Sequence, residues 1–244
     1  MSDDVFFCIS AYTGNFDILK YSSNNIVYIK KGASTTGEPK NSIKIDNYGY
    51  NIYAYLLFII NNYNNLPRRV LFTKNNIFPR HMSETIFKIR LSQNSRYFFD
   101  PENCTYRKPL AYIDIDGTFC EINNSWYIKN NTCRYFGSLD LFLNHCFEFK
   151  DNPRYIRFPP GGNILVPQKD ILCRPIEFYQ MLVETINYKE NAPESFLLER
   201  SLDLIFNPLV KLSKTFDKKI PVSQNIPYSG IKRRLQSLTL PLLQ

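Results

Sequence analysis

The order of short apolar runs and one helical repeat in the first third of the chain constrains its fold more than any other feature. Val5–Ser10, Ile26–Lys30 and Arg69–Thr73 have the length and apolar content of buried strands. Between the last two, apolar residues recur at helical spacing from Ile52 to Tyr63, and Leu66-Pro67 ends that helix. The order strand, strand, helix, strand predicts a parallel sheet whose strands are joined by crossover helices.

Segments of both kinds continue down the chain, which predicts an α/β protein throughout. Ser138 has the position and side chain of a helix N-cap, and Pro175 and Pro193 each stand where a helix begins. The further expected elements are strands at 43–46, 111–115 and 163–166 and helices at 82–91, at 138–147, from Pro175 and from Pro193. We predict a single α/β domain over residues 1–208 and a basic, irregular C-terminal extension over 209–244.

Composition places the chain among globular proteins of the cell interior. With 244 residues, 44% of them hydrophobic and 15% aromatic, it has the apolar side chains to form a core. No run is long and apolar enough to be a transmembrane segment, and Met1-Ser2-Asp3-Asp4 is acidic where a secretory signal peptide would be basic. The six cysteines contain no C-x-x-C pair and only two histidines are present, which disfavours zinc. We expect a soluble cytoplasmic protein with reduced thiols.

The net charge of +8 is concentrated at one end of the chain. Residues 209–244 contain seven basic residues and one acidic residue, a net charge of +6, so the preceding body carries +2. Since polyanion binding needs clustered charge, we expect no specific nucleic-acid partner. The basic tail is able to contact anionic surfaces, although a solvated extension is the commoner role of such a tail.

The sharpest local signal is the segment from Ile113 to Thr118, in which Asp114 and Asp116 leave an expected strand and enter a glycine-bearing loop. Two carboxylates at this spacing suit Mg²⁺ or Mn²⁺, because hard cations prefer oxygen ligands and neutralise a diphosphate leaving group. This is the pattern of the metal-diphosphate motif of sugar-nucleotide transferases. An equally weighted interpretation is a strand end that turns through Asp and Gly without any metal.

The same segment resembles the first motif of haloacid-dehalogenase phosphatases, in which the first aspartate is the nucleophile and the second an acid/base. That motif normally lies near the start of its domain, and an acidic pair follows it downstream. Here 113 residues precede Asp114, and downstream acids such as Asp140, Asp151, Asp170 and Asp203 stand singly. The phosphatase is therefore the less favoured alternative.

A second signal is spread over residues 5–207. Asn47-Tyr48-Gly49 precedes the first helix and Tyr63 to Pro67 ends it, while Gly161-Gly162 and Glu199-Arg200 come much later. In this order and spacing the chain resembles a family of uncharacterised proteins from fungi, bacteria and large DNA viruses that are similar to nucleotide-diphospho-sugar glycosyltransferases. The resemblance implies a glycosyltransferase-A-like (Rossmann-like) fold, a mostly parallel sheet flanked by helices.

The resemblance also implies a nucleotide-sugar donor, a glycan acceptor and a role for each candidate residue. Asp114 and Asp116 would bind Mg²⁺ or Mn²⁺, with Asp116 and Glu199 the catalytic carboxylates. The substrate-binding residues would be Asn47 and Gly49 in the donor pocket, Gly161 and Gly162 in the glycine loop, and Asn124 and Trp126 against the acceptor. Trp126 is the only tryptophan, and a buried structural anchor is the commoner role for such a residue.

The chain departs from the family pattern at two places. Its first strand leads to Ala11-Tyr12-Thr13-Gly14-Asn15, which has no acid, and Tyr50-Asn51 stands where the family usually has a charged residue. These departures favour the alternative of a catalytically inactive binding or scaffold protein with the same fold. The transferase hypothesis requires that the acidic pair, the glycine loop and the Asn47–Gly49 corner share one pocket.

Overall fold

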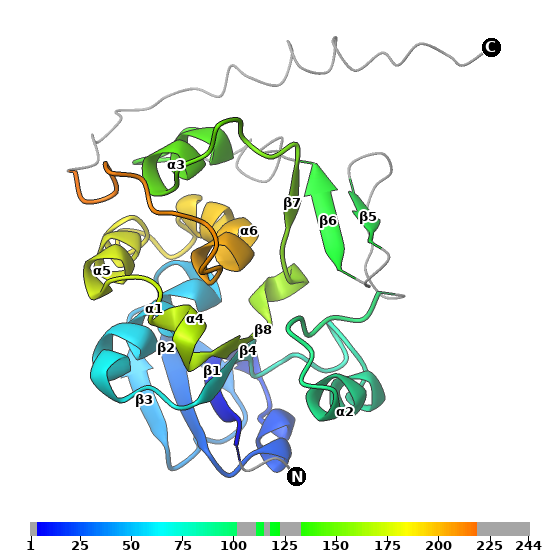
Figure 1. The fold of residues 1–244 in the computed structure, drawn as a ribbon. Coiled ribbons are helices and arrows are strands. Elements are labelled where there is room, and N and C mark those ends of the chain that lie inside the picture. Colours follow the sequence, from blue (N-terminus) through cyan, green and yellow to red (C-terminus); the bar gives the residue numbers. More distant parts are fainter. Residues whose placement is uncertain (1–3, 102–110, 115–117, 123–132, 219–244) are drawn as a thin grey trace.

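A computed structural model describes residues 4–101, 111–114, 118–122 and 133–218 (Figure 1). Within these ranges the main sheet has five strands in the order β3-β2-β1-β4-β8. The first four are parallel and the last is antiparallel, which confirms an α/β fold with a mostly parallel sheet. The strands are β1 (Phe6–Gly14), β2 (Asn25–Thr35), β3 (Ser42–Ile45), β4 (Arg69–Lys74) and β8 (Ile164–Pro167).

The central strands are apolar on both faces because helices cover both faces of the sheet. Alternate side chains of β1 point to opposite sides, so Cys8 belongs to one core cluster while Phe7 and Ile9 belong to the other. The first cluster packs under α1 (Tyr50–Asn62), α5 (Ile176–Glu184) and α6 (Glu194–Ile205). The second lies against α2 (Glu84–Ser92) and the 3-10 turn η1 (Asp17–Tyr21), where the rings of Phe7 and Phe87 lie 6.2 Å apart.

The middle of the chain adds a second, antiparallel sheet in the order β5-β6-β7, which lies apart from the main sheet (Figure 1). Its strands are β5 (Ala111–Ile113), β6 (Phe119–Ile122) and β7 (Tyr155–Arg157). The expected strand at 111–115 therefore exists but is shorter, and it pairs with its neighbour in the chain instead of joining the parallel strands. A short connection favours this local antiparallel pairing, whereas a parallel partner requires a long crossover.

The predicted helices are present with small shifts at their ends. Ser138 caps α3 (Leu139–Cys146) as expected, since its Oγ accepts a hydrogen bond from the Leu141 N–H at 3.1 Å. Strands β6 and β7 and the short helix α4 (Gln168–Ile171) were not predicted. Runs of three or four residues carry little periodicity, so only some of them, such as β3, β5 and β8, are recognised. No helix in the described ranges has the length and apolar content needed to cross a membrane.

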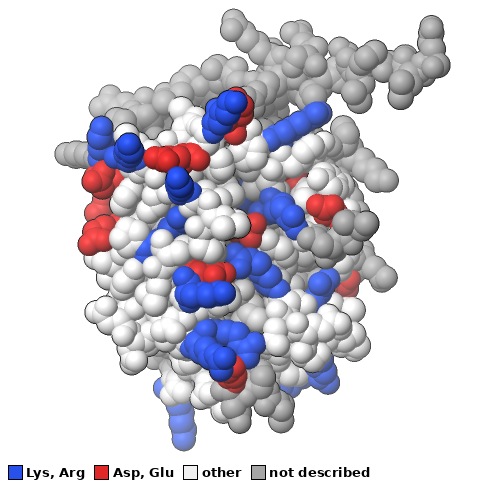
Figure 2. All heavy atoms as spheres, viewed as in Figure 1, with Lys and Arg blue, Asp and Glu red and all other residues white. Residues whose placement is uncertain are grey.

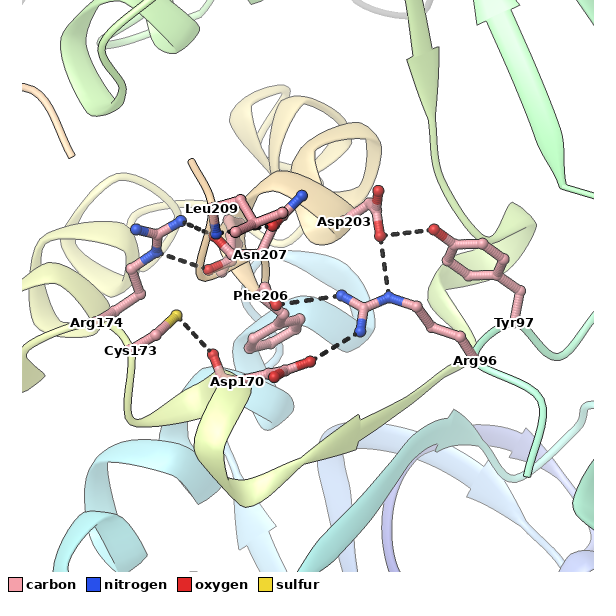
Figure 3. A network of polar contacts seen from close by, with 10 residues as sticks. Arg96, Tyr97, Asp170, Cys173, Arg174, Asp203, Phe206, Asn207 and Leu209 are labelled. Atoms are coloured by element: carbon pink, nitrogen blue, oxygen red, sulfur yellow. Dashed lines mark hydrogen bonds and ion pairs between the residues drawn. The ribbon is translucent and has the colours of Figure 1, made fainter. Parts of the chain in front are cut away.

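Polar side chains tie the end of α6 to the rest of the fold (Figure 3). The Arg174 side chain is buried and donates hydrogen bonds to four backbone carbonyls, of Leu204, Ile205, Asn207 and Val210, over 2.6–2.9 Å. Nearby, Arg96 forms 3.0 Å ion pairs with both Asp170 and Asp203. Because the last carbonyls of a helix lack partners within the helix, Arg174 acts as a C-terminal cap for α6.

The described part of the segment after Pro208 packs against the domain. The Glu148 N–H donates to the Lys211 carbonyl at 3.0 Å, and the Ser213 N–H donates to the Cys146 carbonyl at 3.0 Å. The Phe216 ring lies 5.9 Å from that of Phe178 on α5. The first ten residues of the expected basic extension thus contact α3 and α5, and residues 219–244 lie outside the described ranges.

Candidate functional site

The carboxyl edge of the parallel sheet has a position where the chain leaves in two directions. From β1 the chain proceeds to β2 on one side, and it returns through α1 to β4 on the other side of β1. Open α/β sheets bind ligands at such a switch point, because the loops diverge there and leave a crevice. Here the switch point lies between the ends of β1 and β4, where Ser10 pairs with Lys74.

Lys74, at the end of β4, is the central charged group of this edge. Its side chain is half-buried, and burial lowers the pKa of its amine. The negative charge of Glu199 opposes that effect on the pKa, while the positive charges of Arg80 and Arg200 add to it. Residues from β4, the following loop and α6 therefore place their charges close together at the switch point.

His81 closes one side of this cluster. A Cβ atom added to Gly161 would lie only 2.7 Å from its ring, so the imidazole and the glycine loop are in close contact. Burial lowers the His81 pKa to about 4, and the charges of Lys74 and Arg80 contribute. His81 is therefore neutral near pH 7, and its buried Nε2 has no hydrogen-bond partner among the described residues. It offers a ligand a neutral hydrogen-bonding group.

The glycine loop lies against the first turn of α1. The Asn51 side chain is 4% exposed, and its Nδ2 donates to the Gly161 carbonyl at 3.3 Å. A Cβ atom on Gly162 would lie 2.6 Å from the same nitrogen. The Asn51 Oδ1 is buried and has no hydrogen-bond partner within the described ranges. Buried polar atoms usually have one, so the protein leaves this acceptor unsatisfied.

This close approach predicts that Gly162→Ala lowers the free energy of unfolding by about 2–4 kcal/mol, because the methyl group meets Asn51 and the backbone has a φ of +73°. Gly37→Ala is the matched control, since its φ is +79° but no atom lies within 4 Å of the added Cβ. We expect the control to cost about 1 kcal/mol, from backbone strain alone. Urea denaturation of both variants measures the difference, and equal losses would contradict the close approach.

Helix α6 contributes the other half of the cluster. Glu199 forms a 3.2 Å ion pair with Arg200, and Arg200 also contacts Glu121 of β6 at 3.3 Å. The Glu199 side chain is 15% exposed, so its carboxylate is largely removed from water. The beginning of the helix is fixed by Glu194, whose buried carboxylate accepts 2.7 Å hydrogen bonds from the N–H groups of Arg134 and Tyr135. The helix therefore holds Glu199 on a rigid support.

The Asn47–Gly49 corner lies beside the cluster. Gly49 has a φ of +48°, is buried against Ile186 and forms the N-cap of α1, so its role in the structure is to shape the turn. Asn47 is half-buried two residues earlier. The corner and the glycine loop thus meet through Asn51, at opposite sides of the same helix start.

The expected metal pair is only half described. Asp114 follows β5 in the second sheet, and its N–H closes a hairpin by donating to the Thr118 carbonyl at 2.8 Å. Asp116 lies outside the described residues, as do Asn124 and Trp126. In the described ranges no group of three His, Cys, Asp or Glu side chains is arranged to bind a metal ion. The carboxylate of Asp114 by itself does not form a site for Mg²⁺ or Mn²⁺, which need several oxygen ligands.

Two hollows lie elsewhere on the domain, and neither has Lys74, Glu199 or the glycine loop in its walls. One, of about 550 Å³, lies beside β2, β3 and α1, and its walls include Lys30, Asp46 and Tyr53. The other, of about 470 Å³, lies at the amino edge and contains Arg68, Arg69 and Lys169. Figure 2 shows basic side chains gathered down the middle of one face, with acidic side chains among them. Since Asp4 contacts both Arg68 and Arg69, at 3.7 and 2.5 Å, the second hollow has much of its charge compensated.

Glu199 and the glycine loop were candidate residues from the sequence, and their roles stay predictions, whereas Lys74 and Arg80 were not identified. A signal for Lys74 was present: a lysine directly after the apolar run Val70–Thr73 lies at the carboxyl end of a strand. Its charged neighbours come from α6 and so are not visible in the local sequence. A comparison with known protein families, curated proteins and solved structures finds no match to this chain.

Proposed function

We propose that this protein binds a nucleotide-sugar at the carboxyl edge of its parallel sheet and transfers the sugar to an acceptor hydroxyl. The observation that carries the proposal is that the charges of Glu199, Arg80 and Arg200 all act on Lys74, and that Glu199 is ion-paired to Arg200. Cations at this position suit a diphosphate, and a partly buried carboxylate beside them suits the removal of a proton. A glycosyltransferase-A-like arrangement of the fold belongs to this proposal.

The proposed reaction requires a base for the acceptor proton and cations for the negative charge that develops on the diphosphate. The acceptor oxygen attacks the anomeric carbon, its proton passes to Glu199, and the bond from that carbon to the diphosphate oxygen breaks. Negative charge then grows on the diphosphate, where Lys74 and Arg80 stabilise it. Arg200 is ion-paired to Glu199 and orients that carboxylate. His81, neutral near pH 7, donates or accepts a hydrogen bond without adding charge.

The hollow of about 550 Å³ beside β2, β3 and α1 supports a nucleotide ligand, because its size falls in the range of small-molecule sites. The side chains of Tyr53 and Leu57 give it apolar surface, and Asp46 offers an acceptor to hydroxyl groups. Lys30 lies in its wall, and the charge of Lys74 acts on Lys30. Lys30 thus links the hollow electrostatically to the cationic cluster, while Lys74, Arg80 and Glu199 are not in its walls.

Binding of Mg²⁺ or Mn²⁺ by Asp114 and Asp116 stays a prediction. The described residues around Asp114 do not by themselves provide the oxygen ligands of a divalent cation, so the mechanism above includes no metal-dependent step. The positive charges of Lys74 and Arg80 act on the diphosphate in this mechanism.

Calorimetric titration with UDP, GDP and their glucose and mannose derivatives tests the proposal. We expect Lys74→Met to weaken nucleoside diphosphate binding about 10- to 100-fold, since a hydrogen bond to a charged group contributes about 1.5–3 kcal/mol. Lys150→Met is the control, because it removes one exposed positive charge from the loop between α3 and β7. It is expected to change the affinity less than twofold at 0.15 M salt.

The outcomes separate the proposal from its alternatives. If no nucleotide binds the wild-type protein, or if the two lysine variants behave alike, the proposed site is wrong. Binding without any release of nucleoside diphosphate from the sugar derivatives would instead identify a binding protein. The replacement of the family's charged residue by Tyr50-Asn51 is the observation that favours this second function.

A further inference from the structure

Tyr50 has a backbone conformation that few large side chains adopt. Its φ is +51°, and it directly follows Gly49, whose φ is +48°. Among the described residues, only Tyr50 and Asn94 combine a positive φ with a side chain. Glycine and asparagine tolerate this region well, whereas a tyrosine there is strained. Such strain persists where the surrounding structure enforces it, and it is most frequent at functional sites.

Lys30 is the group that enforces this turn. Its side chain is 4% exposed, and its ammonium group donates hydrogen bonds to the carbonyl oxygens of Tyr48, at 2.5 Å, and of Tyr50. The Gly49 N–H donates to the Lys189 carbonyl at 3.3 Å. The two carbonyls that flank Gly49 are therefore held by one buried side chain, which stabilises the left-handed conformation of both residues.

The turn presents the Tyr50 ring at the candidate site. The side chain stays 39% exposed, although it begins a helix whose next residue, Asn51, is buried. One part of the ring packs against Phe196, with ring centroids 4.9 Å apart. The charges of Glu199, Glu190 and Arg80 act on its hydroxyl. An aromatic surface is thus open to solvent against α6, the helix that carries Glu199, and within the electrostatic reach of Glu199 and Arg80.

We propose that Tyr50 is the platform on which the sugar ring of the nucleotide-sugar packs, and that Lys30 positions it. This inference rests on the proposed function. The apolar C–H face of a sugar packs well against an aromatic ring, while its hydroxyl groups bond to neighbouring polar side chains. Glu199 and Arg80 are polar neighbours of this kind. The strained turn places the ring there, because a right-handed Tyr50 would continue the helix and direct its side chain elsewhere.

The test compares a sugar nucleotide with the same nucleotide lacking the sugar, UDP-glucose with UDP and GDP-mannose with GDP. Tyr50→Asn removes the ring but keeps a residue that accepts a positive φ, so the turn is preserved. We expect this variant to bind the sugar nucleotide at least tenfold more weakly and the free diphosphate within twofold of wild type. Lys30→Met keeps the stem and removes the two hydrogen bonds to the turn, so it is expected to weaken sugar-nucleotide binding at least tenfold. Because Lys30 also lines the hollow proposed for the nucleotide, binding of the free diphosphate is expected to weaken too, but less.

Tyr112→Ala is the matched control, because Tyr112 is 41% exposed and also contacts one aromatic ring, in the second sheet. It is expected to leave both affinities unchanged. A purely structural Tyr50 would alter thermal stability without changing the ratio of the two affinities. An unchanged ratio in Tyr50→Asn, with both ligands still bound, overturns this inference alone. If the wild-type protein binds neither ligand, the proposed function and this inference both fail.

Discussion

Replacing Arg174 by methionine is expected to lower the free energy of unfolding by about 3–5 kcal/mol. The guanidinium is 3% exposed and donates to four carbonyl oxygens at and beyond the end of α6. Methionine fills much of the same volume but removes the guanidinium donors, and the carbonyls of Leu204 and Asn207 then keep only the N–H groups of Asn207 and Val210. The helix also loses the positive charge that complements its C-terminal dipole. Urea denaturation followed by circular dichroism measures the change.

Arg68→Met is the control for this prediction. Arg68 has a side chain that is 82% exposed, and its contact with Asp4 is a 3.7 Å surface ion pair. Such pairs contribute about 0–1 kcal/mol, so this variant is expected to be nearly as stable as wild type. Arg174→Lys is a second comparison. A lysine ammonium lacks the planar set of donors with which the guanidinium reaches four acceptors. If Arg174→Met proves as stable as Arg68→Met, Arg174 does not cap α6.

Glu199→Gln is expected to reduce release of nucleoside diphosphate from a nucleotide-sugar by about 10²- to 10⁴-fold, the usual contribution of a general base. Glutamine still accepts a hydrogen bond from Arg200, which contacts Glu199 at 3.2 Å, so the local structure is retained. The amide cannot accept the acceptor proton at neutral pH. Release of UDP or GDP, measured with a coupled assay at saturating donor, gives the rate.

The same variant separates catalysis from binding. The Glu199 carboxylate raises the pKa of Lys74 and repels an anionic ligand. Its removal should therefore leave the affinity for UDP or GDP unchanged or make it tighter, while turnover is lost. Glu184→Gln, an exposed position at the end of α5, is the control and should change neither quantity. A variant that loses affinity and turnover together would show that Glu199 binds the donor and is not the base.

The loops and helix that meet at Lys74 show where prediction from sequence stops. The glycine loop and Asn51 are 110 residues apart and are joined by one hydrogen bond, a pairing that no local pattern specifies. Glu199 was proposed from a resemblance, yet its ion pair with Arg200 and its proximity to Lys74 depend on how α6 packs. The strand before Asp114 was recognised, but its sheet was not, because pairing depends on partners as short as β6 and β7.

The sequence by itself determined the α/β class, the parallel order of the first strands and the ends of most helices. These features follow from apolar periodicity, prolines and caps such as Ser138, which act over a few residues. Only the tertiary structure decided that the charge of Glu199 acts on Lys74, that the glycine loop meets His81 and Asn51, and that Lys30 holds Tyr50 in a strained turn. The physical reason is that charge, burial and hydrogen bonding at a site come from residues far apart in the chain, whose proximity is fixed by packing of the whole core.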